Sequence, residues 1–225
     1  MHIVVTGGTG GLGTSVVATL LARGAEIHLP IVEAELPKHL PWRGEPKVHA
    51  KQVSLDDEAG AKAYYAALPP LWASIHLVGG FAMAPIGMTS LADFEKMWRL
   101  NTATCFLACR EAVRTMKRTK TAGRIVNVAA RPVVQPAGGM ISYVAGKAGV
   151  AAITQSLAAE VVGDGILVNA VVPSIIDTPA NRVSMPNADH ASWPQPAQIA
   201  ETIAFLASPE NALTSGTLVP VYGRA

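Results

Sequence analysis

The chain reads Thr6-Gly7-Gly8-Thr9-Gly10-Gly11-Leu12-Gly13 directly after a short apolar run, residues 2–5. An apolar segment over 15–23 follows and ends at Gly24, which predicts a strand, a glycine-rich turn and a helix in that order. Glycines let the backbone turn sharply and approach a pyrophosphate, and the amino end of a helix offers free N–H groups. A glycine cluster alone would also fit a structural turn, but its place between strand and helix favours a nucleotide-phosphate site.

The alternation that begins with this unit continues along the chain. Strands are expected at 26–32, 48–53, 73–78, 124–128, 167–172 and 218–222, and helices at 57–67, 91–117, 142–162 and 197–207. Pro30, inside the second apolar run, predicts a strand end or a distortion. Strands separated by helices imply parallel crossovers, so we expect an α/β fold with a doubly wound, seven-stranded parallel sheet and helices on both faces. We expect one domain over 1–225, with an irregular substrate-side loop over 174–196.

Composition excludes several classes of function. Half of the 225 residues are hydrophobic and only 15% are charged, so much surface is expected to lie between subunits or on a sheet covered on both faces. The net charge of +2 gives no strong field for nucleic acid or for an acidic membrane. There is no apolar run of about 18 residues that would span a membrane, and the start lacks the features of a signal peptide. We expect a cytoplasmic protein.

The thiols and imidazoles give no sign of a metal site. Cys105 and Cys109, the only cysteines, lie one turn apart in a segment expected to be helical. They are expected to be two reduced, partly buried thiols and not a disulfide or a metal pair. The six histidines show no metal-ligand spacing, so no metal is expected.

Tyr143 and Lys147 lie on one face of a predicted helix, one turn apart. An ammonium beside a phenol stabilises the phenolate, so the tyrosine pKa is expected to fall and the phenol to suit proton transfer. Either residue alone would be ordinary, a core tyrosine or a surface lysine, but with the phosphate turn they indicate a catalytic pair. Upstream, where a hydroxyl partner would be sought, the chain reads Val128-Ala129-Ala130, and alanine has no hydroxyl to donate.

The Thr-Gly-x-x-x-Gly-x-Gly spacing of 6–13, together with Tyr143-x-x-x-Lys147, resembles the short-chain dehydrogenase/reductase family over nearly the whole chain. The resemblance implies a Rossmann fold, an NAD(P) cofactor and catalysis by Tyr143, Lys147 and Asn101, the last supporting a water-linked proton path to the lysine. Asn101 could also be a polar helix residue satisfied locally. The resemblance further implies that the cofactor is bound by Tyr143 and Lys147 and by Thr6, Gly7, Thr9, Gly11, Leu12, Gly13, Val53, Gly79, Pro173, Ile176 and Thr178.

Two positions depart from the family pattern. His76-Leu77-Val78-Gly79 stands where the family has Asn-Asn-Ala-Gly, and the family's catalytic serine falls on Ala130. A narrower resemblance accommodates both departures, because the branch of quinonoid dihydropteridine reductases also lacks the serine. The similar segments are 78–81, 139–143, 177–182 and 184–189, with Trp193 soon after.

The missing serine bears on the substrate. In the family mechanism its hydroxyl bonds the substrate oxygen that gains charge, and losing one such donor costs about 2–4 kcal/mol. We therefore expect hydride transfer to an activated carbonyl, imine or quinonoid ring, with a pteridine-like substrate possible and Tyr143 as proton donor. The alternative is a catalytically weak or inactive NAD(P)-binding sensor or scaffold. Ser142 and Gln135 are weaker candidates to replace the hydroxyl, since Ser142 would point about 100° from Tyr143 on the helix.

Four residues are candidates for substrate contact. Phe81 follows the fourth strand, whose carboxyl end should face the cleft, and Ala130 takes the serine position. Arg182 could meet a polar or anionic substrate or merely cap a small helix. Trp193 is expected to pack within a lid more than to stack on substrate.

The sequence gives weaker signals for the choice between NAD(H) and NADP(H) and for the oligomeric state. NAD preference usually needs a carboxylate at the end of the second strand, and none is expected there unless Glu33 reaches back. With nothing to repel a 2′-phosphate, the sequence leans slightly to NADP(H) over NAD(H). The small side chains of Ala145, Ala148, Ala152 and Ala159 would let another helix approach closely, as in a homodimer or homotetramer, although they could equally pack on the sheet.

Overall fold

The computed structural model describes residues 1–224 and contains one sheet of seven parallel strands in the order β3-β2-β1-β4-β5-β6-β7. The predicted sheet is therefore confirmed. Its strands are β1 (His2–Thr6), β2 (Glu26–Ile31), β3 (Val48–Gln52), β4 (Leu71–His76), β5 (Arg124–Val128), β6 (Leu167–Pro173) and β7 (Leu218–Val221).

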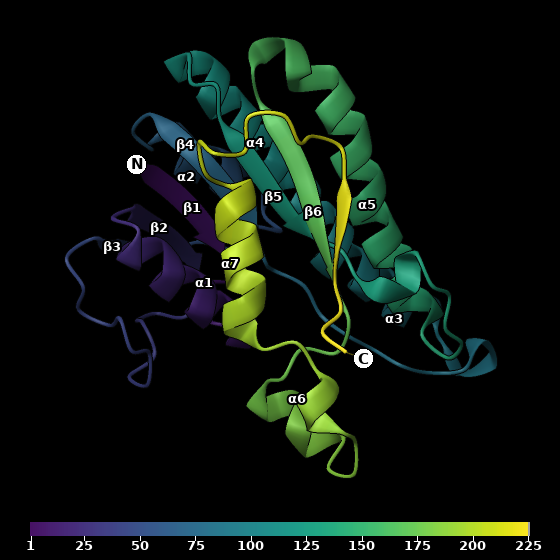
Figure 1. Cartoon of the computed structure of the whole chain (residues 1–225). Coiled ribbons are helices and arrows are strands. Elements are labelled where there is room, and N and C mark those ends of the chain that lie inside the picture. The colour runs from purple at the N-terminus through teal and green to yellow at the C-terminus, as the bar shows by residue number, and fades with distance from the viewer. Residues whose placement is uncertain (225) are drawn as a thin grey trace.

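Helices cover both faces of this sheet (Figure 1). One face carries α1 (Gly11–Ala22) and α7 (Pro196–Leu206), which pack on a buried cluster that includes Ile27 and Ile203. The opposite face carries α2 (Glu58–Ala66), α4 (Thr104–Thr119) and α5 (Ile141–Val161), over a second cluster that includes Leu71 and Ile125. Because both faces are buried, the central strands are nearly continuous apolar runs.

The strand order reverses between β1 and β4, since the chain first winds outward to β2 and β3 and then continues on the other side through β5, β6 and β7. Ligands of open α/β sheets bind outside the carboxyl ends of the strands at such a reversal. The phosphate turn after β1, the glycines after β4 and the segment after β6 all leave the sheet at this edge. Figure 1 shows α6 (Pro179–Ser184) standing beyond it.

Several expected boundaries differ from those observed. The strand β2 runs through Pro30 without ending, because its pairing with β1 stops at His28 and Pro30 pairs only with β3. The segment 91–117 is not one regular helix: α3 (Leu91–Trp98) and α4 are joined by a π-helical turn, Arg99–Ala103. The segment 174–196 is only partly irregular, because it contains α6.

The small residues of α5 do not all pack on the sheet. Ala148, Ala152 and Ala159 are exposed on the outer face of the helix. A second helix could therefore approach α5 from outside. Among the described helices, none combines the length and apolar character needed to cross a membrane.

Candidate active site

The turn between β1 and α1 has the backbone that a phosphate site needs. Gly7 has a φ of +66°, and a Cβ on Gly13 would lie 2.1 Å from the carbonyl oxygen of Gly7, so both positions require glycine. No side chain caps α1 at Gly10, which leaves the first amides of the helix available to an anion. This turn fits the pyrophosphate of a dinucleotide.

Two threonines tie this turn to its surroundings. The hydroxyl oxygen of Thr6 accepts from the amide of Leu77 at 3.1 Å and joins the end of β1 to the end of β4. A Cβ on Gly11 would lie 2.9 Å from Cγ2 of Thr178, so the segment after β6 lies directly against the phosphate turn. These predicted contact residues are thus adjacent in space although they are far apart in sequence.

The predicted catalytic pair, Tyr143 and Lys147, lies on α5 as expected, but the electrostatics of the two side chains differ from the prediction. Lys147 is 6% exposed, and its ammonium donates to the carbonyl oxygen of Val128 at 2.8 Å. Burial lowers the pKa of Lys147 to about 8, and burial raises the pKa of Tyr143 to about 12. The expected fall in the tyrosine pKa was wrong, because desolvation dominates and the lysine bonds a carbonyl oxygen. A neutral phenol is therefore available as a proton donor over the whole physiological pH range.

Asn101 lies in the π-helical turn and is fully buried. Its amide nitrogen donates to the carbonyl oxygens of Met97 and Gly80, and its oxygen accepts from the amide of Gly80. A Cβ on Gly79 would lie 2.6 Å from this oxygen and 3.0 Å from the ammonium nitrogen of Lys147. Asn101 is satisfied locally, and it also stands beside the lysine.

Ala130 follows β5 and is 3% exposed, so no hydroxyl exists at that place. Neither weaker candidate is free to replace it, because Ser142 is buried and Gln135 accepts from the Arg131 guanidinium at 2.6 Å. Phe81 meets the ring of Tyr143 edge-on, with centroids 4.9 Å apart, and is 62% exposed. It presents an open aromatic surface next to the phenol.

The two candidates in the segment after β6 are occupied. Arg182 forms a two-point ion pair with Asp177, which also accepts from Gln195 at 2.6 Å. These hydrogen bonds lower the pKa of the Asp177 carboxyl to about 2. Trp193 is 5% exposed and packs against His190, with the two rings tilted to each other and their centroids 4.6 Å apart. Both side chains hold this segment together and offer little to a substrate in this conformation.

The remaining predicted cofactor residues lie along the same edge. Pro173 ends β6 and pairs with β7, and Ile176 packs partly buried on the core beneath α1. Val53 follows β3 and donates its amide to the carbonyl oxygen of Ile31 at 2.8 Å. Leu12, in the first turn of α1, packs against the same core.

Glu33 bears on whether the cofactor is NAD(H) or NADP(H). The hydroxyl of Thr9 donates to the Glu33 carboxylate at 3.1 Å, which brings this acid back from the loop after β2 to the phosphate turn. The lean to NADP(H) rested on the absence of a carboxylate here, and the structure shows the alternative in which Glu33 reaches back. Glu33 also stands twenty residues beyond Gly13, which is the usual spacing of the acid that bonds an adenosine ribose.

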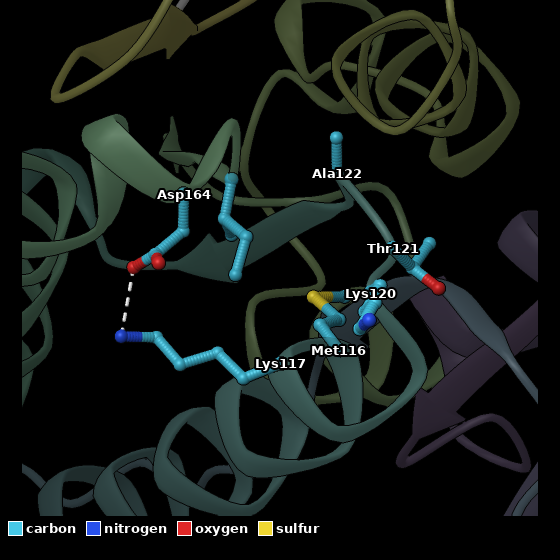
Figure 2. A pocket seen from close by; sticks show the side chains of 7 residues that line it. Met116, Lys117, Lys120, Thr121, Ala122 and Asp164 are labelled. Carbon is cyan, nitrogen blue, oxygen red and sulfur yellow. Dashed lines mark ion pairs between the residues drawn. The ribbon is translucent and has the colours of Figure 1, made fainter.

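Two cavities lie away from the catalytic pair. A hollow of about 340 Å³ opens at the amino ends of β5 and β6, where Lys117 and Asp164 form an ion pair at 2.7 Å (Figure 2). A cavity of about 660 Å³ lies beside the loop after β2, between Leu36 and Gln52.

One cluster was missed by the reasoning from sequence. His76, Cys105 and Cys109 converge in the core beneath the catalytic edge, with ligand atoms within 4.8 Å of one another. The only signal in the sequence was the unusual histidine at the end of the fourth strand, whose distance along the chain from the cysteines hides the contact.

Comparison with known proteins identifies the family of the chain. The model of the family described as short chain dehydrogenase matches residues 1–189. The chain is 28% identical to a levodione reductase of Leifsonia aquatica, covering 98% of this chain and 92% of that protein. It is 29% identical to a 3-beta-hydroxysteroid dehydrogenase of Comamonas testosteroni, covering 95% and 91%.

Solved structures share the fold. A crystal structure of levodione reductase has a TM-score of 0.89 at 26% identity, covering 99% of this chain and 96% of that one. The structure of ElxO with NADP bound has a TM-score of 0.91 at 23% identity, covering 99% and 97%. With the phosphate turn and the Tyr143–Lys147 pair at one edge of the sheet, the chain belongs to the short-chain dehydrogenase/reductase family and is an NAD(P)-dependent oxidoreductase.

Proposed function

We propose that this enzyme reduces an activated acceptor, such as a reactive dicarbonyl, an imine or a quinonoid ring, with Tyr143 as the proton donor. The observation that carries the proposal is the combination of a neutral Tyr143 with a buried Ala130 where the family has a serine. Without that hydroxyl the site has one donor fewer for a developing oxyanion, so the substrate must supply more of its own reactivity.

A pteridine-like substrate is the specific form of this proposal. It rests on the likeness of segments 78–81, 139–143, 177–182 and 184–189 to quinonoid dihydropteridine reductases. The exposed ring of Phe81, set edge-on to Tyr143, would offer a flat heterocycle an aromatic wall.

Each residue of the site has a distinct role in this proposal. The phosphate turn and Thr178 would hold the pyrophosphate end of the cofactor, and the bound NAD(P)H supplies the hydride. Tyr143 holds a proton at its phenol oxygen for the acceptor atom. Lys147 would bind and orient the nicotinamide ribose of the cofactor. Asn101 holds the Gly79–Gly80 backbone next to Lys147 through its hydrogen bonds to Gly80. The segment 174–196, within a single domain of 1–225, would cover the substrate from the edge that α6 occupies.

For the cofactor we favour NAD(H) over NADP(H). The Glu33 carboxylate, held at the phosphate turn by Thr9, would accept from ribose hydroxyls and repel a 2′-phosphate. ElxO, whose structure contains NADP, is only 23% identical to this chain, so it supports the fold and not the choice of cofactor. Glu33→Gln should shift the ratio of kcat/KM for NADH to that for NADPH toward NADPH by about tenfold, the equivalent of about 1.4 kcal/mol. Glu35→Gln, at an exposed acid nearby, is the matched control and should leave the ratio unchanged.

The exposed small-residue face of α5 also favours a homodimer or homotetramer. Sedimentation at several protein concentrations tests this. A monomer at every concentration would contradict it.

The central test measures turnover of quinonoid dihydropterin, a reactive dicarbonyl and a simple ketone with NADH and NADPH. We expect turnover of an activated acceptor and little of the ketone, and Tyr143→Phe should lower kcat by about a hundredfold or more while cofactor binding survives. The second candidate, a cofactor-binding sensor or scaffold, is favoured only by Ala130. Tight cofactor binding without turnover of any electrophile, unaffected by Tyr143→Phe, would replace the reductase by this candidate.

A further inference from the structure

A group of polar side chains lies in the apolar core beneath the catalytic edge. His76 on β4 and Asn127 on β5 are register partners, so their side chains lie next to each other on one face of the sheet. Ser74 is two residues before His76 and therefore points to the same face. All three are at most 4% exposed, and the face they share is the one covered by α2, α4 and α5.

Helix α4 brings both cysteines of the chain to this point. Cys109 Sγ lies 3.4 Å from Nδ1 of His76 and 3.5 Å from Oδ1 of Asn127. Cys105, one turn earlier, has its sulfur 4.0 Å from that of Cys109. Burying this many polar groups is costly unless they bond one another or a shared partner, so the cluster is a built feature of the core.

We propose that His76, Cys105 and Cys109 form a buried binding site for one Zn²⁺ ion, with the Asn127 side-chain oxygen as the fourth neighbour. Tetrahedral zinc holds two sulfurs about 3.8 Å apart and a sulfur and a nitrogen about 3.6 Å apart, given Zn–S and Zn–N distances of about 2.3 and 2.05 Å. The observed 4.0 and 3.4 Å are close to these values. The third pair, the Cys105 sulfur and a His76 ring nitrogen, lies within 4.8 Å, so the Cys105 side chain must rotate toward the imidazole to reach this separation.

A disulfide fits the same atoms less well. It would bring the sulfurs from 4.0 Å to about 2.05 Å, on two residues fixed one turn apart within a regular helix. Zinc leaves the distance between the two sulfurs almost unchanged, because 4.0 Å is already close to the separation in a tetrahedral site. The geometry thus favours a shared cation over a covalent bond.

The two imidazole nitrogens differ in their partners: Nδ1 of His76 lies 2.8 Å from Oδ1 of Asn127, a hydrogen bond that must open when an ion binds between them, whereas the bond at Nε2 suits a ligating imidazole. Nε2 of His76 lies 2.8 Å from the hydroxyl oxygen of Ser74, which lies 3.0 Å from the hydroxyl of Tyr65. A ligating histidine commonly donates its other ring N–H to such a partner. On binding, the imidazole proton moves from Nδ1 to Nε2, both thiols lose their protons to solvent, and no electron is transferred.

Charge balance favours a divalent ion. Two thiolates neutralise Zn²⁺, so the buried site carries no net charge. The ammonium of Lys147, which interacts electrostatically with Cys105, then faces a neutral complex. The ion would link the end of β4 to α4, whose Cys105 follows Asn101 by four residues in the chain.

The test uses the full-length protein, reduced and stripped of metal with a chelator, and then titrated with Zn²⁺ or Co²⁺. We expect about one equivalent to bind, releasing about two protons, and Co²⁺ to give thiolate-to-metal charge-transfer absorption with tetrahedral d–d bands. At a free Zn²⁺ concentration of about ten times Kd, alkylation of the thiols should slow about tenfold, because only the metal-free fraction reacts. Cys109→Ser should abolish the charge-transfer band.

Surface histidines supply the matched control. His2, His28 and His49 gather beside Glu26 and could collect metal, so His28→Gln should leave the thiolate band unchanged. Zinc bound equally by Cys109→Ser, or cobalt bound without a thiolate band, would overturn the proposal and leave the cluster as two reduced thiols. If Cys109→Ser fails to fold, proton release and thiol protection in the unaltered chain decide alone. Their absence would likewise overturn it.

Discussion

Restoring the missing hydroxyl with Ala130→Ser should extend the substrate range to simple ketones. Ala130 is 3% exposed with an extended backbone (φ −159°, ψ 150°), which serine adopts without strain, and the change adds a single oxygen to an existing Cβ. The backbone at the end of β5 therefore accepts serine without strain. It supplies a donor where the family has one.

The size of the gain lies between two limits. A fully aligned donor to a developing oxyanion is worth about 2.7–4 kcal/mol, or about a hundred- to a thousandfold, and an ordinary net hydrogen bond only about 1 kcal/mol. The introduced hydroxyl would lack the refined alignment of a native donor. We therefore expect kcat/KM for an unactivated ketone to rise about tenfold to a hundredfold, the equivalent of about 1.4–2.7 kcal/mol.

The assay compares kcat/KM for a simple ketone and for an activated acceptor, with unfolding midpoints of both proteins measured alongside. The ketone should gain and the activated acceptor should change by less than about threefold, because it needs the donor less. Ala129→Ser is the matched control, since Ala129 packs into the core beneath α5 and should give no gain. An unchanged ketone rate in a well-folded Ala130→Ser protein would refute the link between the missing serine and the substrate.

Gly79→Ala should lower kcat/KM about tenfold to a hundredfold, because its Cβ would lie 2.6 Å from the Asn101 oxygen and 3.0 Å from the Lys147 nitrogen. Gly87→Ala, where a Cβ meets nothing within 4 Å, should leave it unchanged. Burial lowers the pKa of Lys147 to about 8, so the KM for cofactor should rise as the pH passes 8 and the ammonium is lost; a flat profile to about pH 9.5 would contradict this. Burial, aided by the neighbouring histidines, lowers the pKa of His28 to about 4 from 6.5, so the folded state binds fewer protons than the unfolded state between these values. Stability should be full above pH 6.5 and fall toward pH 4, and urea midpoints of His28→Gln should fall less over that range.

Much of the fold and of the site could be predicted from local patterns. The turn needs a positive φ at Gly7 and a close backbone approach at Gly13. Only glycine meets either requirement easily, so both could be predicted from the residue type. Short apolar runs separated by helical segments predicted all seven strands. Parallel strands that are buried on both faces consist almost entirely of apolar residues, so they can be recognised in the sequence. The four-residue spacing of Tyr143 and Lys147 predicted that both side chains lie on one face of a helix.

The architecture, the phosphate turn and the helix that carries Tyr143 and Lys147 could therefore be predicted from the chain alone, since they depend on backbone conformation and on short-range periodicity. The tertiary structure was needed for everything that depends on burial and on contacts between distant segments. It turned Glu33 back to Thr9, raised the pKa of Tyr143, and placed His76 against two cysteines of α4. Desolvation and side-chain contact are set by what packs around a group, and neighbours in space are not neighbours in the chain.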